Sequence, residues 1–204
     1  MKLFKIILCA SFFIFSGNSH AIEITPFFGY RSGGEVVDDT TSKKHSIISS
    51  NIYGFLVSAP YVHGKTLELY YSHQSSDIRS INITIPAAVN DANIALNIDY
   101  LHIGGTAPIS TENKFKTFVS GGLGFTYLSP DLGALNSELR FSLSLGVGLK
   151  YPISENISLR LETRGLATMF NNNSSIFCSG GCTLSVNGSF LFQGEIFAGL
   201  AIGF

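Results

Sequence analysis

The sequence predicts an all-β protein: one eight-stranded, antiparallel, up-and-down transmembrane β-barrel. The first observation is that apolar side chains alternate with small or polar ones along residues 188–204, which is the period of two of a β-strand. The second is composition. The 204-residue chain has a mean hydropathy of +0.29 and only 13% charged residues, but beyond the N-terminus no apolar run reaches the ~20 residues of a spanning helix. This combination is typical of membrane strands, because half of their residues face a lumen.

Residues 1–21 are expected to be a signal peptide. Lys2 and Lys5 form a basic start, residues 6–15 are an apolar run of suitable length, and residues 19–21 place small side chains before a cleavage point after Ala21. The mature chain would then be one barrel domain, residues 22–204. An N-terminal membrane anchor is the alternative, but the apolar run is short and a strand pattern begins directly after it. Attachment of a lipid at Cys9 is disfavoured because the apolar run continues past it.

Eight segments with strand character follow, and none has a helical period over the length that a helix needs. They are residues 22–31, 46–58, 65–74, 94–106, 114–128, 138–151, 156–169 and 189–204. Three connections are short, and each contains a proline, which lacks the N–H that a strand ladder uses: residues 59–64, 107–113 and 152–155. Four are longer and more polar: residues 32–45, 75–93, 129–137 and 170–188. Short turns at one end of a barrel and long loops at the other are typical of membrane barrels.

The two faces of a strand are clearest in residues 138–151. One face is apolar from Phe141 to Tyr151, and the other carries Ser142, Ser144, glycines and Lys150. In a soluble β-sandwich, the rival fold, the apolar face would form the core; in a membrane barrel it faces lipid. Three features favour the barrel: Tyr and Phe near segment ends, as an interfacial belt requires, a polar face of Gly and Ser instead of Lys and Glu, and a final strand that ends flush at Phe204.

Ten charged residues have the parity expected of the lumen, and acidic and basic residues are equal in number. They are Glu23, Arg31, Glu68, Asp99, Lys116, Lys150, Arg160, Glu162, Arg164 and Glu195. A buried unpaired charge is very unfavourable, whereas a balanced, hydrogen-bonded set is tolerated. We therefore expect a salt-bridged plug in the lumen, with Arg160, Glu162 and Arg164 contributed by one strand. The alternative for each residue is a place at a strand end near the lipid headgroups.

Several stretches together resemble the small outer-membrane β-barrel superfamily, with its OmpA-, OmpX- and OmpW-like members, and in particular uncharacterised proteobacterial outer-membrane β-barrel proteins. They are ITPFFGYRSGGEV, LELYYSHQSS, IDYLHIGGT, FVSGGLGFTYLSP, FSLSLGVGLKYPISENISLRLETRG and FCSGGC. The resemblance implies a monomer in the cell outer membrane of a Gram-negative bacterium, with periplasmic termini and four extracellular loops. It implies outer-membrane lipids and lipopolysaccharide as contacts, Phe204 as a C-terminal signal for the barrel-assembly machinery, and no catalytic residues.

Cys178 and Cys182 lie close together in the last long loop, with Gly180 and Gly181 between them. In an exported chain, such a local pair is expected to form a disulfide, and the glycines give the backbone freedom that a tight ring needs. A redox pair or half of a metal site is the alternative. No metal site is expected, because no His or further Cys lies nearby.

His73 and Ser75 share one face of the segment 65–74 and its continuation, and by parity that face is lipid-facing, opposite Glu68. A His and a Ser near the outer leaflet can act as base and nucleophile on a lipid ester, and outer-membrane lipid A deacylases use such a pair. The chemistry also needs an orienting acid, which the spacing does not fix. The alternative is a polar strand end at headgroup level, so we expect no enzyme and no cofactor.

The favoured function is therefore a small outer-membrane barrel with a structural or surface-interaction role. The alternative is a narrow, porin-like channel for small or hydrophobic solutes, as in OmpW-like barrels; a lipid A-modifying enzyme is less favoured. A net charge of −1 gives no electrostatic footprint for nucleic acid.

The processing and disulfide hypotheses predict one covalent form. Intact-mass analysis of the exported protein without reductant should give the mass of residues 22–204, less the hydrogens lost when Cys178 and Cys182 are oxidised. Adding reductant should restore those hydrogens. A mass that includes residues 1–21, or one that reductant leaves unchanged, would contradict the corresponding hypothesis.

Overall fold

The computed structural model describes residues 22–37, 44–79, 94–110, 114–131, 136–170 and 190–204. The expected signal peptide, residues 1–21, and the expected disulfide between Cys178 and Cys182 lie outside these residues.

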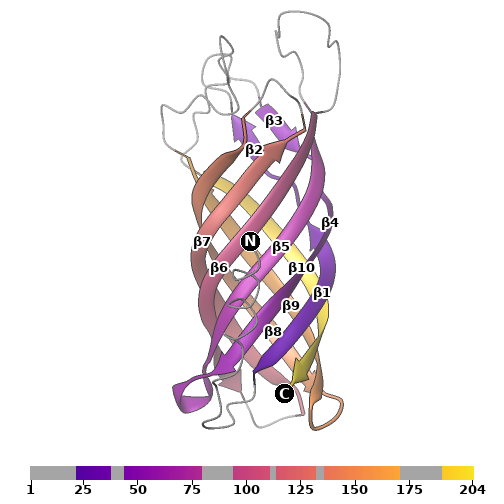
Figure 1. Cartoon of the computed structure of the whole chain (residues 1–204), viewed down its shortest axis with the longest axis vertical. Coiled ribbons are helices and arrows are strands. Elements are labelled where there is room, and N and C mark those ends of the chain that lie inside the picture. The colour runs from indigo at the N-terminus through magenta and orange to yellow at the C-terminus, as the bar shows by residue number, and fades with distance from the viewer. Residues whose placement is uncertain (1–21, 38–43, 80–93, 111–113, 132–135, 171–189) are drawn as a thin grey trace, which may run out of the picture.

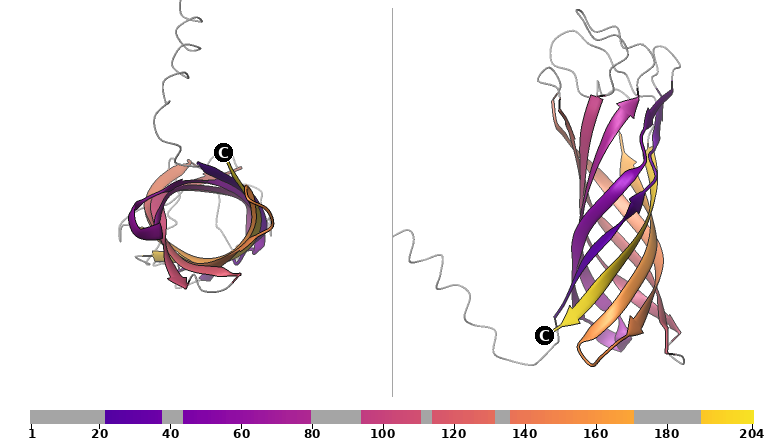
Figure 2. Two further views of the ribbon diagram at one scale, coloured as in Figure 1. Left: turned by 90° about the horizontal axis from the view of Figure 1, so that it is seen from below. Right: turned by 90° about the vertical axis from the view of Figure 1, so that its right-hand side faces the viewer.

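Eight long antiparallel strands among the described residues close into a barrel (Figures 1 and 2). They are β1 (Glu23–Arg31), β4 (Ser50–Pro60), β5 (Thr66–Arg79), β6 (Ile94–Ser110), β7 (Lys116–Pro130), β8 (Glu138–Pro152), β9 (Ile157–Met169) and β10 (Phe190–Gly203). Each pairs with the next along the chain, and β10 pairs with β1, so that every one of them has two neighbours. The predicted fold is confirmed.

Two short strands, β2 (Glu35–Val37) and β3 (Lys44–Ile47), form a hairpin that the alternation did not predict. The prediction began the second barrel strand at residue 46, whereas β3 ends at Ile47 and β4 starts at Ser50. The break is stabilised by new partners: the amide of Ile47 donates to Gly34 and that of Ile48 to Asp77, both at 2.9 Å. Ile47 is buried among the apolar side chains at this end of the lumen. A Cβ at Gly33 would lie 1.6 Å from the backbone carbonyl oxygen of Ile47, so this close approach requires glycine.

The two chain ends of the barrel lie together at the end opposite the hairpin (Figure 1). Glu23 pairs with Gly203, and the amide of Phe204 donates to the carbonyl of Ile22 at 3.0 Å. The tight connections between β4 and β5 and between β8 and β9 lie at this same end. The first of them contains the 3₁₀ turn η1 (Val62–Gly64), with His63 and Gly64 at positive φ. We call this the terminus end, and the opposite one the loop end. No helix in the described part of the chain is long and apolar enough to cross a membrane.

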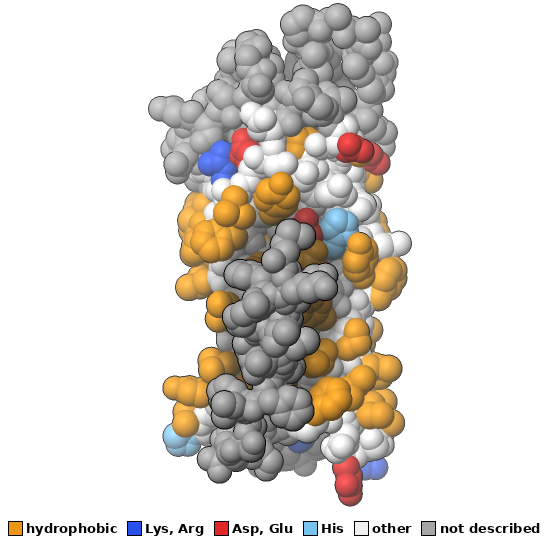
Figure 3. Space-filling model, viewed as in Figure 1, with side chains coloured by type: hydrophobic (Ala, Val, Ile, Leu, Met, Phe, Trp, Pro, Cys, Tyr) orange, Lys and Arg blue, Asp and Glu red, His pale blue; other side chains and the backbone are white. Residues whose placement is uncertain are grey.

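Burial alternates along the barrel strands, and the apolar face points outward. On β8, Leu145 is 69% exposed, whereas Ser142 and Ser144 are buried. On β10, Phe192, Ile196 and Leu200 face outward and alternate with the buried residues Gln193, Glu195 and Phe197. Apolar side chains accordingly cover much of the visible wall, and charged ones lie mostly toward its ends (Figure 3). This is the arrangement of a barrel that faces lipid, and not of a β-sandwich.

The lumen also contains an apolar layer that the charge parity did not anticipate. Ile52, Leu96, Ile98, Leu128 and Leu166 are each no more than 1% exposed and belong to one buried cluster. An eight-stranded barrel has an interior that side chains just fill. The interior here is therefore a packed core with both apolar and ionised parts.

The outward apolar face predicts a depth-dependent response to charge. Leu145→Arg, in the middle of β8, should lower the free energy of unfolding by about 2 to 4 kcal/mol, because it places a cation at mid-membrane depth; Leu139→Arg, near the end of β8, should cost at most about 1 kcal/mol. Denaturant titration of the protein folded into lipid vesicles measures both. Equal losses at the two positions would contradict the assignment of this face to lipid.

Candidate functional site

The first group of buried charges is the Arg160 cluster, formed by Glu68, Ser120, Arg160, Glu162 and Arg164. Arg160 bridges the two carboxylates, donating to Glu68 Oε1 at 2.6 Å and to Glu162 Oε2 at 2.6 Å. Arg164 and Ser120 both donate to Glu162 Oε1, at 2.7 and 2.6 Å. Arg160, Glu162 and Arg164 alternate along β9 and therefore share its lumen face, while Glu68 reaches them from β5 across the barrel.

The second group is the Arg31 cluster, formed by Arg31, Tyr70, Ser72, Gln74 and Glu195. Arg31 Nη2 lies 2.7 Å from Glu195 Oε2, and both side chains are fully buried. The guanidinium also donates to Ser72 and to Gln74, and the Tyr70 hydroxyl donates to Glu195. Arg31 lies directly opposite Glu195 where β1 pairs with β10, so this ion pair spans the seam between the first and last strands.

Aromatic rings connect the two clusters. The Arg164 guanidinium carbon lies 4.2 Å from the centre of the Tyr70 ring, whose hydroxyl belongs to the Arg31 cluster. Phe27 stacks between Tyr70 and Phe197, with ring centres 5.6 and 4.3 Å away. Cation–π contacts of this kind are strongest where water is excluded. The two clusters and their rings therefore form one continuous interior layer across the lumen.

The charges of this layer balance. Arg31, Arg160 and Arg164 are paired with Glu68, Glu162 and Glu195, and each of the six is at most 6% exposed. Removing one member of a buried ion pair is far more costly than the net contribution of the intact pair, because an unpaired charge is left behind. The six charged side chains are therefore stable in the low-dielectric interior only while all of them are paired.

Three further residues in the predicted lumen set lie near the barrel rim or on the outside. Glu23 and Lys150 form an ion pair at the terminus end, 2.6 Å between Oε1 and Nζ, with side chains about a fifth exposed. Lys116 is exposed at the start of β7, opposite Lys150. These positions correspond to the strand-end alternative for Glu23, Lys116 and Lys150.

The prediction that Asp99 faces the lumen is wrong. Its neighbours Ile98 and Tyr100 are fully buried in the interior, so Asp99 points outward. The carboxylate accepts hydrogen bonds from the Tyr71 hydroxyl at 2.9 Å and interacts with His73 Nδ1 at 2.8 Å. The error arose because β6 carries polar residues at both parities, so its alternation does not fix the two faces.

The parity argument also missed polar residues that carry no formal charge. His102 is buried between Ser142 and Ser144, with ring nitrogens 2.8 and 3.1 Å from their hydroxyls. Tyr100 donates to Gln193 at 2.8 Å. At the loop end of β8, Glu138 and Arg140 form an ion pair at 2.6 Å that was not predicted either. The strand parity of His102, Tyr100 and Gln193 could be predicted, but only charged residues were selected for the lumen set.

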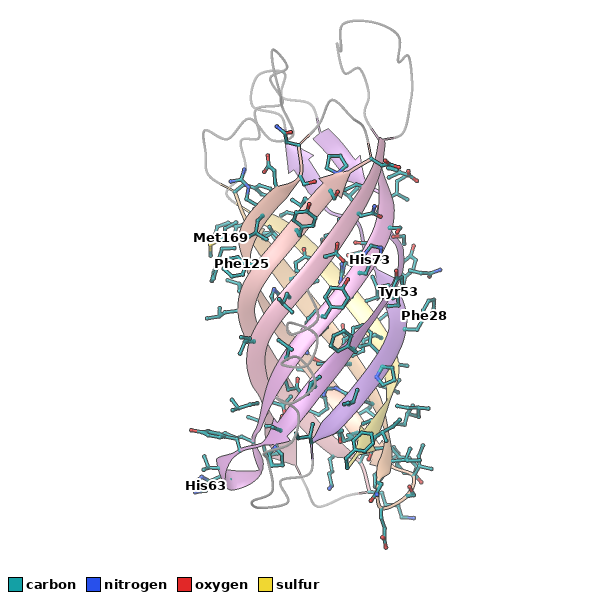
Figure 4. All side chains as sticks on the ribbon, in the orientation of Figure 1. Phe28, Tyr53, His63, His73, Phe125 and Met169 are labelled. Carbon is teal, nitrogen blue, oxygen red and sulfur yellow. The ribbon has the colours of Figure 1, made fainter. Side chains whose placement is uncertain are left out.

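His73 and Ser75 lie on the outer wall, as their parity predicted. The His73 Nε2 atom is 3.1 Å from Ser75 Oγ, and Ser75 Oγ donates to Asn97 Oδ1 at 3.0 Å. Figure 4 shows His73 beside Tyr53, nearer the loop end of the barrel than the terminus end. The structure therefore brings together on one patch the His, the Ser and the misassigned Asp99.

The family model described as the outer membrane protein beta-barrel domain matches residues 18–190. This chain belongs to that family. Membership of the outer membrane protein beta-barrel family places the chain in the outer membrane, in agreement with its lipid-facing wall. Among curated proteins, none matches the sequence.

Solved structures of small outer-membrane barrels are similar to this family member in fold. Neisserial surface protein A shares 14% identity over 90% of this chain and 97% of that one, with a TM-score of 0.56. OprG from Pseudomonas aeruginosa shares 13% over 91% and 96%, with a TM-score of 0.58. AlkL, solved in lipid bilayers, shares 10% over 93% of each chain, with a TM-score of 0.54. At these identities the likeness establishes the architecture alone.

His, Asp and Glu residues are dispersed over the described part of this outer-membrane barrel. No group of three or more His, Cys, Asp or Glu residues there is arranged to hold a metal ion.

Because the Arg160 cluster is fully paired, loss of a buried carboxylate should destabilise the protein more than loss of a carboxylate at the rim. Glu162→Gln should lower the free energy of unfolding by about 3 to 5 kcal/mol, since it leaves Arg160 and Arg164 without their shared carboxylate. Glu23→Gln removes a carboxylate from a rim pair whose side chains are about a fifth exposed, and it should cost at most about 1 kcal/mol. Denaturant titration in vesicles compares the two. A Glu162 variant as stable as the Glu23 variant would contradict the pairing.

Proposed function

We propose that this protein is a closed outer-membrane barrel with a structural and surface-interaction role, whose lumen does not conduct. The observation that carries the proposal is the filled interior. The Arg31 and Arg160 clusters occupy the middle of the lumen, and the apolar layer around Ile98, Leu128 and Leu166 lies on their loop-end side.

Ion passage would require two different barriers to be removed. In the middle of the lumen, an ion would have to separate Arg31 from Glu195 or Arg160 from its carboxylates, leaving buried charges unpaired. Toward the loop end, it would have to shed water against apolar side chains, without compensating hydrogen bonds. The narrow-channel alternative needs both layers to move together, so we favour the closed barrel.

We assign the surface role to the four long connections between the barrel strands. We propose that the terminus end is periplasmic and that the four long connections face outward, where they contact lipopolysaccharide and other surface partners. The position of both chain ends beside the tight turns supports this orientation. We propose further that the protein acts as a monomer without nucleic acid and that the barrel-assembly machinery reads Phe204.

Planar-bilayer recording tests the closed lumen. The wild type should show no steady single-channel steps. Glu68→Ala with Arg160→Ala removes one acid and one base, and it should remain silent because the Arg31 cluster still closes the lumen. Adding Arg31→Ala and Glu195→Ala, together with Ile98→Ala, Leu128→Ala and Leu166→Ala in the apolar layer, removes both barriers and should give small, steady steps.

Two controls make the recording interpretable. Leu139→Ala, on the outer wall, should behave as the wild type does. Faster migration of every unboiled variant on a gel reports that its barrel has folded. Steady steps from the wild type would overturn the proposal, and silence of the folded sevenfold variant would show that these two layers are not the barrier.

A further inference from the structure

An acid, a base and a nucleophile are linked in sequence on the outer wall. Asp99 Oδ1 lies 2.8 Å from His73 Nδ1, and His73 Nε2 lies 3.1 Å from Ser75 Oγ. With Nδ1–H donated to the carboxylate, Nε2 is the nitrogen that can accept the serine proton. We call Ser75, His73 and Asp99 the outer-wall triad. It contains the orienting acid that residue spacing left open.

The register of the sheet builds this arrangement. His73 and Ser75 are two residues apart on β5 and therefore share its outward face. Asp99 is paired with His73 and Asn97 with Ser75 across the β5–β6 ladder. Directly opposed residues of antiparallel strands have Cβ atoms about 5 Å apart. At this separation, the polar ends of side chains of this length can form hydrogen bonds with each other. The four side chains thus form a square on two adjacent strands.

Two neighbouring tyrosines hold the triad in place. The Tyr71 hydroxyl donates to the same Asp99 oxygen that faces His73, at 2.9 Å. On the other side, the Tyr53 ring centre lies 5.1 Å from that of the imidazole. The carboxylate and the imidazole are therefore each fixed by a contact that takes no part in proton transfer, as the orientation of a catalytic base requires.

The triad lies where the wall changes from apolar to polar. The row of paired residues on its terminus-end side is Phe55, Tyr71, Leu101, Phe125 and Phe141. Ser75 itself belongs to the next row toward the loop end from His73 and Asp99, and that row also contains Asn97 and Ser129. Aromatic residues mark the boundary between hydrocarbon and headgroups. The acyl esters of membrane lipids lie at this same boundary, with water within reach on the polar side.

We propose that the outer-wall triad hydrolyses fatty-acyl esters of lipids in the leaflet at the loop end. This activity goes beyond the closed-barrel function and does not depend on it, because the triad and the plug lie on opposite faces of the sheet.

The reaction balances with water as the only co-reactant. Ser75 Oγ attacks the ester carbonyl carbon while its proton passes to His73 Nε2. The tetrahedral intermediate expels the lipid alkoxide, which takes that proton and leaves as an alcohol. Water then attacks the acyl-serine and gives a proton to His73, and collapse of the second intermediate returns a proton to Ser75 and releases the fatty acid. Asp99 stabilises the imidazolium throughout and is a positioning residue.

Asn97 is placed to stabilise the oxyanion. In the resting arrangement its Oδ1 accepts the Ser75 hydroxyl proton, which competes with His73 for the same hydrogen. Rotation of the amide about its Cβ–Cγ bond presents the NH₂ group instead, frees the hydroxyl for His73 and supplies a donor for the developing negative charge.

Fatty-acid release from vesicles tests the activity. Full-length protein is reconstituted into vesicles containing either lipid A or phospholipid alone, and released fatty acids are measured by mass spectrometry. The wild type should release fatty acid from at least one lipid. Ser75→Ala should reduce kcat/KM on the order of 10³-fold or more, to near the protein-free rate. Ser129→Ala, on the same polar row, should retain wild-type activity.

A second readout follows the nucleophile directly. A fluorophosphonate should add once to the wild type and to Ser129→Ala, as measured by intact mass, but not to Ser75→Ala. Asp99→Asn should slow labelling and lower kcat with little change in KM, and Asp99→Glu should restore part of both. Gel migration of unboiled samples confirms that each variant is folded.

Each outcome decides the proposal. Release from lipid A only, from phospholipid only or from both supports it and identifies the substrate. It is overturned if the folded wild type releases nothing from either lipid, whether or not Ser75 is labelled, or if Ser75→Ala releases as much as the wild type. The latter results would leave the three residues as a polar cluster at headgroup level. The bilayer recording is independent of all these outcomes.

Discussion

Closure of an eight-stranded sheet is the constraint on which the rest of this structure depends. In lipid, every backbone polar group of a strand must be paired within the protein, and a closed barrel satisfies this by removing both sheet edges. Closure also fixes the interior, because eight strands leave space for side chains and little else. Three kinds of contact fill that space in this protein: buried ion pairs, stacked aromatic rings and an apolar layer.

The strands and their lipid-facing sides could be predicted because alternation is a local property. Leu145 and Ser144 differ in polarity at adjacent positions, and no knowledge of their partners was needed. The prediction failed where a strand is polar on both sides, as β6 is at Asp99 and Tyr100, and where a break is stabilised by distant groups, as at Ile47 and Gly34. Most of the charged residues that face the lumen could be predicted from the sequence. Their ion-pair partners could not, because residues such as Glu68 and Arg160 meet across the barrel.

Cross-strand register explains the part of the outer-wall site that could not be predicted. His73 and Ser75 are close in sequence, and parity placed them correctly on one face. Asp99 is separated from His73 by 26 positions and reaches it only because β5 and β6 pair with that particular offset. A slip of one residue would turn Asp99 into the lumen. β5 consequently serves two environments: Tyr70, Ser72 and Gln74 complete the interior layer, while Tyr71, His73 and Ser75 face lipid.

The ion pair between Arg31 and Glu195 joins residues 164 positions apart, on the first and last strands. Because these two residues lie on the strands whose pairing closes the cylinder, an open sheet carries both charges without each other until its two margins meet. Formation of the ion pair therefore lowers the free energy of the closed barrel relative to that of an open sheet. The ion pair thus couples closure of the barrel to the neutralisation of two buried charges.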